Sequence, residues 1–122
     1  MTPLRLLLSD DLVPIAEELC GLLGVPCTVV SAPAAWSAPV HRIVQVSLPR
    51  LHARVFEAAA ALRGSSVPLF MAGWIERCRA ELAGGDDAWV VRTCQRLAEW
   101  ERLGYTGEEA AVRELVREVS RA

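Results

Sequence analysis

Short apolar runs alternate along this chain with longer stretches in which apolar residues recur at helical spacing. Residues 4–8 form the first run and predict a buried strand. Residues 12–23 follow, with leucine and alanine on one face and glutamate on another, which predicts an amphipathic helix that ends at Gly24. Residues 27–30 and 43–48 form two more apolar runs and predict two further short strands.

The second half of the chain continues this alternation. Pro49 introduces a helical pattern that Gly64 ends, and residues 67–71 then form an apolar run that predicts a fourth strand. Pro68 lies near the start of that run, where a missing ladder donor costs least. Residues 74–82 again fit a helix.

The remaining segments complete the pattern. Residues 88–91 supply a fifth apolar run, and from Thr93 onward the pattern is helical, with breaks at Gly104 and Gly107. The segment around Trp36 is rich in alanine and proline and predicts a loop or a single turn. The last helix has a narrow apolar stripe opposite a charged face. This stripe consists of Val112, Leu115, Val116 and Val119.

Strand-like runs that alternate with amphipathic helices predict a doubly wound α/β domain, because parallel strands need crossover connections and are buried on both faces. We expect one such domain over residues 1–122, with five parallel strands. In sheets of this kind, ligands bind beyond the carboxyl ends of the strands. Asp10 and Asp11 directly follow the first run and its serine, so they would project into that region.

Composition excludes several classes of protein. Thirteen basic and fifteen acidic residues give a net charge of −2, so no global field attracts nucleic acid or an anionic membrane, although residues 42–63 are locally basic. No apolar run approaches the roughly 18 residues of a membrane-spanning helix. The acidic pair also interrupts the N-terminal apolar region that a signal peptide would need intact. We therefore expect a cytoplasmic protein without membrane contact.

No set of residues predicts catalysis or a bound cofactor. The four cysteines lack the paired spacing of a metal site, so buried reduced thiols are the preferred interpretation. No Ser-His-Asp set, phosphate-binding glycine loop or paired acid and base emerges, and both histidines are expected to be solvated. The cysteines are Cys20, Cys27, Cys78 and Cys94, and the histidines are His41 and His52. We expect neither an enzyme nor a metal or cofactor site.

The sequence around the acidic pair resembles a known family. Leu6-Leu7-Leu8-Ser9-Asp10-Asp11 is similar to the first strand and acidic pair of response-regulator receiver domains, and Val46-Ser47-Leu48-Pro49 to their third strand. Val67-Pro68-Leu69-Phe70-Met71 resembles the fourth strand, and Gly84-Gly85-Asp86-Asp87 the segment before the fifth. The resemblance implies a five-stranded parallel sheet of flavodoxin-like topology, here with a shortened second helix and extended C-terminal helices.

The residue that accepts the phosphoryl group in that family is replaced in this chain. Counting back from Pro49 places Gln45 where the family has its aspartate, and no Asp or Glu occurs between Glu18 and Glu57. An amide is a poor nucleophile, so an acyl phosphate could not form, and a Mg²⁺ site would lack a carboxylate.

The other positions of the implied pocket differ as well. The Ser or Thr that ends the family's fourth strand falls on Ala72 or Gly73, and the lysine of the fifth strand is absent because the chain has no lysine. Arg92 is the nearest cation and could pair with Asp10. Trp89 takes the aromatic position that the family uses as a conformational switch, with simple packing as the alternative. The implied vestigial acidic pocket consists of Asp10, Asp11, Gln45, Ala72, Gly73 and Arg92.

These replacements predict a pseudo-receiver, a signalling or scaffold module of bacterial two-component type that is not phosphorylated. Such a module would act by binding a protein partner or by self-association. Helix capping is an equal alternative for Asp10 and Asp11, in which a carboxylate accepts free backbone donors at a helix start.

A second interpretation treats residues 43–82 as a ribbon-helix-helix DNA-binding unit, with a strand, a proline-started helix, a Gly-Ser turn and a second helix. Gln45 and Ser47 would share the outward face of the strand, and nearby arginines would contact phosphates. Ser66 would cap the second helix, so residues 67–71 would be helical. The arginines are Arg42, Arg50 and Arg54.

Overall fold

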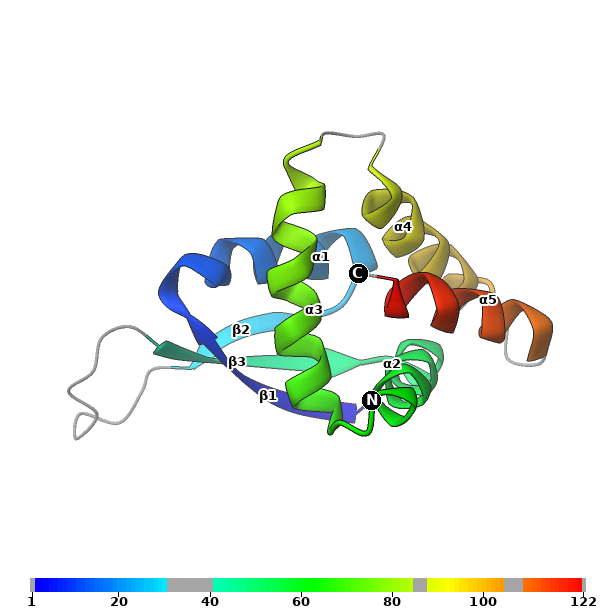
Figure 1. Ribbon diagram of the computed structural model, residues 1–122, viewed down its shortest axis with the longest axis horizontal. Coiled ribbons are helices and arrows are strands. Elements are labelled where there is room, and N and C mark those ends of the chain that lie inside the picture. The colour runs from blue at the N-terminus through cyan, green and yellow to red at the C-terminus, as the bar shows by residue number, and fades with distance from the viewer. Residues whose placement is uncertain (1, 31–40, 85–87, 105–108, 122) are drawn as a thin grey trace.

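A computed structural model describes residues 2–30, 41–84, 88–104 and 109–121. These residues form a three-stranded antiparallel sheet, five α-helices and a short 3₁₀ helix (Figure 1). The strands are β1 (Thr2–Ser9), β2 (Cys27–Val30) and β3 (His41–Leu48). The helices are η1 (Asp10–Leu12), α1 (Val13–Leu23), α2 (Arg50–Leu62), α3 (Val67–Leu82), α4 (Trp89–Arg102) and α5 (Glu109–Ser120).

β3 is the central strand of the sheet and runs antiparallel to both neighbours. β1 pairs with it over its whole length, from Thr2 opposite Leu48 to Ser9 opposite His41. β2 pairs with a shorter stretch of the same strand. β1 and β2 are therefore parallel to each other without being neighbours, and α1 lies in the connection between them.

The predicted five-stranded parallel, flavodoxin-like sheet is wrong. The described sheet has three strands, and each adjacent pair is antiparallel. Only residues 31–40 separate β2 from β3, whereas a parallel return would need a crossover of a dozen or more residues. The loop or single turn predicted around Trp36 lies outside the described residues.

Two of the predicted strands are helical. Residues 67–71 form the first turns of α3, where the Ser66 hydroxyl accepts a hydrogen bond from the Leu69 N–H at 3.4 Å and Pro68 sits in the first turn. Residues 88–91 hold the N-cap and the first turn of α4. A short apolar run does not by itself distinguish a strand from the start of a packed helix, which explains both errors.

The order of α2 and α3, with Ser66 as the cap, agrees with the ribbon-helix-helix interpretation of residues 43–82. The strand of that unit does not agree. A ribbon needs a strand with a free edge for a second chain, whereas β3 is paired on both sides within this chain. β3 could not form such a ribbon without leaving its own sheet.

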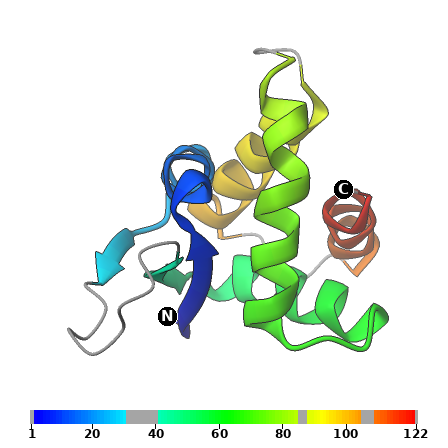
Figure 2. The ribbon, with the colours of Figure 1, turned by 60° about the vertical axis from the view of Figure 1, so that its left-hand side comes forward.

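The helices cover one face of the sheet. On β1 the side chains of Leu6 and Leu8 are buried, and on β3 so are those of Val44 and Val46, whereas the side chains between them are exposed or half-buried. Figure 2 shows α3 and α5 on the same side of the strands. The core between the sheet and the helices contains the fully buried Trp74.

Most other predicted elements are confirmed, including the first three strands, the helices after β1 and β3, and the C-terminal helix. Gly24 ends α1 with a φ of 71°, a conformation that glycine adopts more readily than other residues, and its N–H donates to carbonyls in the last turn. Gly107 and residues 85–87 lie outside the described parts. Among the described helices, none combines the length and the apolar character needed to cross a membrane.

Candidate interaction surface

The face of the sheet opposite the helices, which no described helix covers, carries an apolar row that crosses all three strands; we call it the uncovered face. The register places Leu7 opposite Ile43, and Val30 opposite Ile43 from the other side, so the three side chains lie next to one another. Leu7 is 53% exposed, and the other two are half-buried. We call Leu7, Ile43 and Val30 the apolar row.

A polar row lies beside the apolar row. Arg5, Gln45 and Thr28 are aligned in the same way, two residues along each strand. Arg5 and Thr28 are exposed, and Gln45 is half-buried. An apolar centre bordered by polar side chains is a common composition for a protein-binding surface.

The outer edge of β1 has backbone groups without a partner in the sheet. The Ser47 N–H donates to the Pro26 carbonyl at 3.3 Å, so the odd-numbered residues of β3 turn their backbone groups toward β2. The backbone groups of the even-numbered residues of β3 then face β1, where they pair with the even-numbered residues of β1. The backbone groups of Pro3, Arg5 and Leu7 therefore point away from the sheet. Pro3, which has no N–H, lies where the ladder requires no donor.

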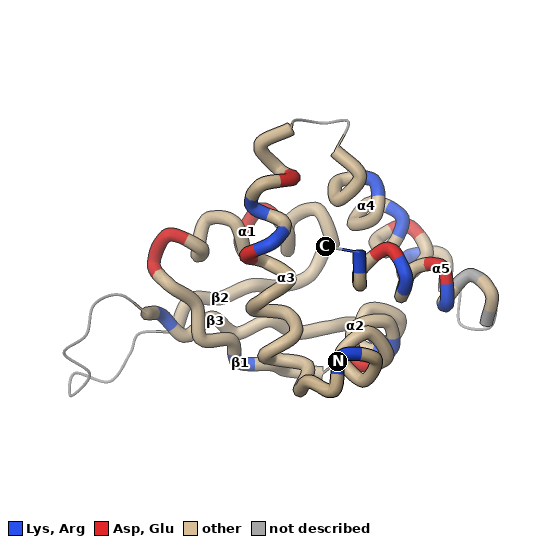
Figure 3. The backbone as a smooth tube through the Cα atoms, in the orientation of Figure 1, with Lys and Arg blue, Asp and Glu red and all other residues tan. Residues whose placement is uncertain are grey.

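The acidic pair adds no free charge to this surface. Arg42 Nε donates to Asp10 Oδ1 at 2.8 Å, and Arg79 Nη1 donates to Asp11 Oδ2 at 2.6 Å. Figure 3 shows the pair at the turn that follows β1. Hydrogen bonds from the Ser9 side chain and from Arg79 hold the pKa of Asp11 below its usual value. Among the described strand residues on the uncovered face, Arg5 is the one that carries a permanent charge.

The structure does not assemble the vestigial acidic pocket. Its residues are Asp10 and Asp11 on η1, Gln45 on β3, Ala72 and Gly73 on α3, and Arg92 on α4. Gln45 faces away from the helices, because it alternates with the buried residues of its strand. No hydrogen bond or ion pair between described residues joins any two of the six, and Asp10 pairs with Arg42 instead of Arg92.

The helix-capping alternative for the acidic pair is not observed either. Ser9 occupies the N-cap position of η1, and its side chain makes no capping hydrogen bond. Leu12 occupies the N-cap position of α1. Asp10 and Asp11 are exposed; each forms an ion pair with an arginine, and Asp11 also contacts the Ser9 side chain.

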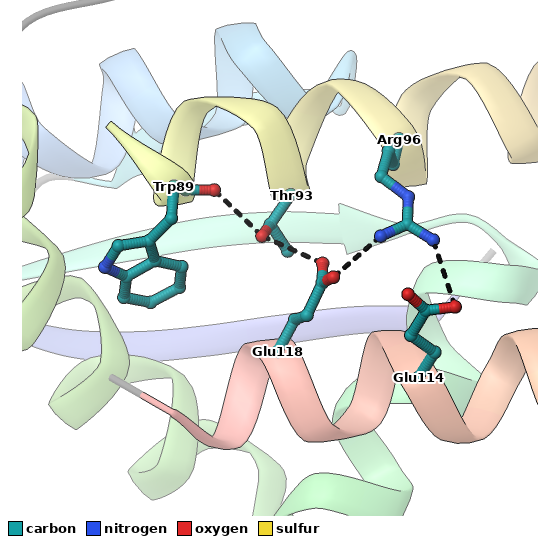
Figure 4. Close-up of polar contacts among 5 residues, drawn as sticks. All are labelled: Trp89, Thr93, Arg96, Glu114 and Glu118. Atoms are coloured by element: carbon teal, nitrogen blue, oxygen red, sulfur yellow. Dashed lines mark hydrogen bonds and ion pairs between the residues drawn. The ribbon is translucent and has the colours of Figure 1, made fainter. Parts of the chain in front are cut away.

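The surroundings of Trp89 agree with the packing alternative. Trp89 is half-buried at the start of α4, and the guanidinium carbon of Arg121 lies 5.7 Å from its ring centroid. Close by, Glu118 on α5 accepts a hydrogen bond from Arg96 at 2.7 Å and lies 3.1 Å from the Thr93 hydroxyl (Figure 4). That hydroxyl is also 2.9 Å from the Trp89 carbonyl oxygen. These contacts join α5 to α4 next to Trp89.

A second polar site, which the sequence analysis missed, lies at the start of α2. His52 was expected to be solvated but is only 1% exposed, with its Nδ1 3.9 Å from Glu101 Oε1. Neither ring nitrogen makes a hydrogen bond of good geometry with a described residue. Burial lowers the pKa of His52, and Glu101 opposes that effect. Its position three residues before Val55 and four before Phe56 places it on their buried helix face, a signal that the sequence contains.

A shallow groove of about 550 Å³ opens beside His52 and Glu101. The end of α1, the start of α2 and the C-terminal half of α4 line this groove. Its further lining residues include Leu22, Gly24, Pro49, Gln95, Ala98 and Arg102. The nitrogen atoms of His52 are closed off from solvent, so the histidine itself offers this groove no polar atom.

The cysteines are free, and three of them are fully buried, as predicted. Cys27 is half-buried. Burial raises the pKa of Cys20 and of Cys78 to about 12, so both remain protonated thiols at neutral pH. Among the described residues, no group of three or more histidine, cysteine or acidic side chains could hold a metal ion.

Comparison with models of protein families, with curated proteins and with solved structures finds no match to this chain.

Proposed function

We propose that this protein is a protein-binding module that receives an extended segment of a partner along the free edge of β1. The proposal is carried by one observation: the backbone groups of Arg5 and Leu7 point outward from a strand that, within the described residues, is paired on one side only. Addition of a strand to an open edge supplies backbone hydrogen bonds for affinity and contacts with alternate side chains for specificity. Protein binding thus remains the expected activity, without the receiver fold.

The side chains along this edge define the chemistry of the partner strand. Leu7 brings the apolar row to the edge, so an apolar partner side chain beside it would cover a leucine that is now 53% exposed. Arg5 lies two residues away on the same face, where the described strand residues include no acid. A carboxylate two residues from the apolar side chain would therefore meet the Arg5 guanidinium.

The same charge argues against a second copy of this chain as the partner. A second β1 would bring another Arg5 to the interface and no free carboxylate, because Asp10 and Asp11 follow the strand and are paired with arginines. Proline and charged residues on an edge strand also limit association between identical edges. We therefore expect a different protein, with acidic and apolar residues on one face of an extended segment.

Binding of a synthetic strand tests the proposal. The probe is the capped, fluorescently labelled peptide Thr-Val-Thr-Glu-Thr-Val-Thr, in which valine and glutamate share one face of an extended chain. We expect fluorescence anisotropy to show saturable binding. A control peptide with lysine in place of glutamate should bind about tenfold more weakly, which corresponds to about 1.4 kcal/mol.

Variants of the protein locate the binding edge. Leu7→Ser and Arg5→Glu should each weaken binding of the glutamate peptide, and Arg5→Glu should shift the preference to the lysine peptide. Leu103→Ser is the matched control, because Leu103 is 59% exposed and lies at the C-cap of α4, outside the sheet. Equal affinity of both peptides for all variants would contradict the proposal. A wild-type dimer in sedimentation experiments that Arg5→Glu alters would instead identify a second copy as the partner.

A further inference from the structure

Arg77, on α3, has a buried guanidinium edge without a hydrogen-bond partner. Its Nε and Nη2 atoms are shielded from solvent, and no described residue accepts a hydrogen bond from either. The guanidinium carbon of Arg77 lies 5.8 Å from the ring centroid of Phe70, and that of Arg63 lies 5.9 Å from the same centroid. Two cations therefore flank one aromatic ring between the end of α2 and α3.

The unpartnered atoms form the edge of the guanidinium that recognises oxyanions. Nε and Nη2 lie on one edge of the planar group, and their N–H bonds point in the same direction. This edge matches the two oxygens of a carboxylate or phosphate group, which it binds through two charge-assisted hydrogen bonds. Buried donors in proteins are rarely left without an acceptor. The arrangement at Arg77 is therefore that of a binding edge whose acceptor is not supplied by the described protein.

Gly73 leaves space for this guanidinium. A Cβ atom placed at Gly73 would lie 3.1 Å from Arg77 Nη1, closer than an ordinary contact. Gly73 lies near the middle of α3, where glycine is less favourable than alanine. The helix thus contains an unfavourable residue where a methyl group would press on Arg77.

The charges around Arg77 favour an anion. Burial and the neighbouring Arg63 lower the pKa of Arg77, whereas the exposed Glu76 acts in the opposite direction. Arg63 donates a hydrogen bond to the carbonyl of Ser120, which places the end of α5 beside this cluster. An anion at this place would reduce the repulsion between the two cations.

We infer that Arg77 is the primary contact of an oxyanion site, which binds the carboxylate or phosphate group of a ligand between α2 and α3. Arg63 adds positive charge, and both guanidinium groups make cation–π contacts with the Phe70 ring. Because Nε and Nη2 are covered, entry of the anion requires a covering side chain to move aside. The site is separate from the edge of β1, and its test does not depend on the proposed function.

Titration of the intact protein with inorganic phosphate or with acetate tests this site, with sodium chloride at matched ionic strength as the reference. We expect the Nε–H resonance of Arg77 in ¹H–¹⁵N NMR spectra to shift saturably with at least one anion, and more than that of Arg92, which is exposed on α4. A response to phosphate alone or to acetate alone supports the site and identifies the group that it prefers. Absence of a saturable shift with both anions overturns the inference.

Three variants at the site and one control variant separate the guanidinium edge from charge alone. Arg77→Gln should weaken anion binding at least about tenfold, and Arg77→Lys should also weaken it, because lysine keeps the charge but lacks the planar edge. Gly73→Ala should weaken it by displacing Arg77, and Arg92→Gln should leave it unchanged. Equal effects of Arg77→Gln and Arg92→Gln would show nonspecific screening and overturn the inference. If Arg77→Gln does not fold, the wild-type titration decides alone.

Discussion

The carboxylate of Glu101, on α4, accepts the backbone N–H of Leu51 in the first turn of α2, with its oxygens 3.2 and 3.1 Å from the nitrogen. Pro49 occupies the N-cap position of α2, and its side chain cannot accept a hydrogen bond. Glu101 therefore supplies, from another helix, the acceptor that a local Ser or Asp commonly provides. Its negative charge also lies at the positive end of the α2 dipole.

Replacement of Glu101 with alanine should destabilise the protein by about 1–2 kcal/mol, because α2 loses its cap and α4 its contact with that helix end. Glu99→Ala is the matched control, since Glu99 is an exposed glutamate on the same helix, and it should change stability by less than about 0.5 kcal/mol. Urea denaturation followed by circular dichroism measures both values. Similar losses in the two variants would show that Glu101 does not act as a cap.

The buried His52 should make stability depend on pH. Burial lowers its pKa in the folded protein, so the unfolded chain binds the proton more readily. Stability should therefore rise with pH between the folded pKa and the unfolded value of about 6.5, by at most about 1.4 kcal/mol per pH unit, and the contribution should be complete above that window. Below the folded pKa of His52, this contribution to stability is lost.

His52→Leu should remove this part of the pH dependence. At neutral pH the variant should be about as stable as the wild type, because it replaces an imidazole without well-formed hydrogen bonds by an apolar group of similar size. His41→Gln, at the exposed start of β3, is the control and should keep the wild-type dependence. Urea midpoints measured from pH 5 to pH 8 test this, and an unchanged slope in His52→Leu would assign the effect to other groups.

Arg96 contacts two glutamates of α5, and the two ion pairs should differ in their contribution to stability. Its Nη1 lies 2.7 Å from Glu118, which is 23% exposed and also contacts the Thr93 hydroxyl, and its Nη2 lies 3.4 Å from Glu114, which is 54% exposed (Figure 4). Double-mutant cycles with alanine should give a coupling of about 1 kcal/mol for Arg96 with Glu118 and about 0.3 kcal/mol or less with Glu114. The reverse order would show that Glu118 does not join α4 to α5.

Two glycines of the first helical segment provide a test of backbone conformation. Gly24 has a φ of 71°, whereas Gly21 lies inside α1, and a Cβ atom at either position would meet no other atom within 4 Å. Gly24→Ala should therefore destabilise by about 1 kcal/mol through strain, while Gly21→Ala should stabilise by about 0.5–1 kcal/mol through helix propensity. The midpoint temperature of thermal denaturation should fall in Gly24→Ala and rise in Gly21→Ala. Shifts of the same sign would mean that Gly24 does not adopt this conformation.

The sequence predicts local structure well where its signals are local. The alternation that places Leu6 and Leu8 inside and Leu7 outside, and the glycine that ends α1, follow from residues near each other in the chain. At residues 66–71 the sequence contains both an apolar run, which suggests a strand, and a serine cap followed by proline, which marks a helix start; the structure follows the second signal. Strand order and direction depend on tertiary contacts, so the antiparallel place of β3 between β1 and β2 could not be predicted from the same pattern.

In the candidate sites, too, features that depend on neighbouring residues could be predicted, whereas features that depend on tertiary contacts could not. Gln45 and Ser47 share the outward face of β3 as expected, because side chains alternate in a strand. The apolar row and the exposed edge of β1 depend on register, which no residue pattern in one strand specifies. The partners of Asp10 and Asp11 come from β3 and α3, and Glu101 reaches Leu51 from α4, so these contacts required the fold.

Amide hydrogen exchange along β1, measured by NMR with and without the glutamate peptide, tests the strand-addition proposal most directly. In the free protein the amides of Leu4 and Leu6 should exchange slowly because they donate to β3, whereas those of Arg5 and Leu7 should exchange fast. Saturating peptide should slow Arg5 and Leu7 at least about tenfold and leave the other two nearly unchanged. Slow exchange of Arg5 and Leu7 without peptide, or peptide protection confined to the β2 edge, would show that the edge of β1 is not the binding site.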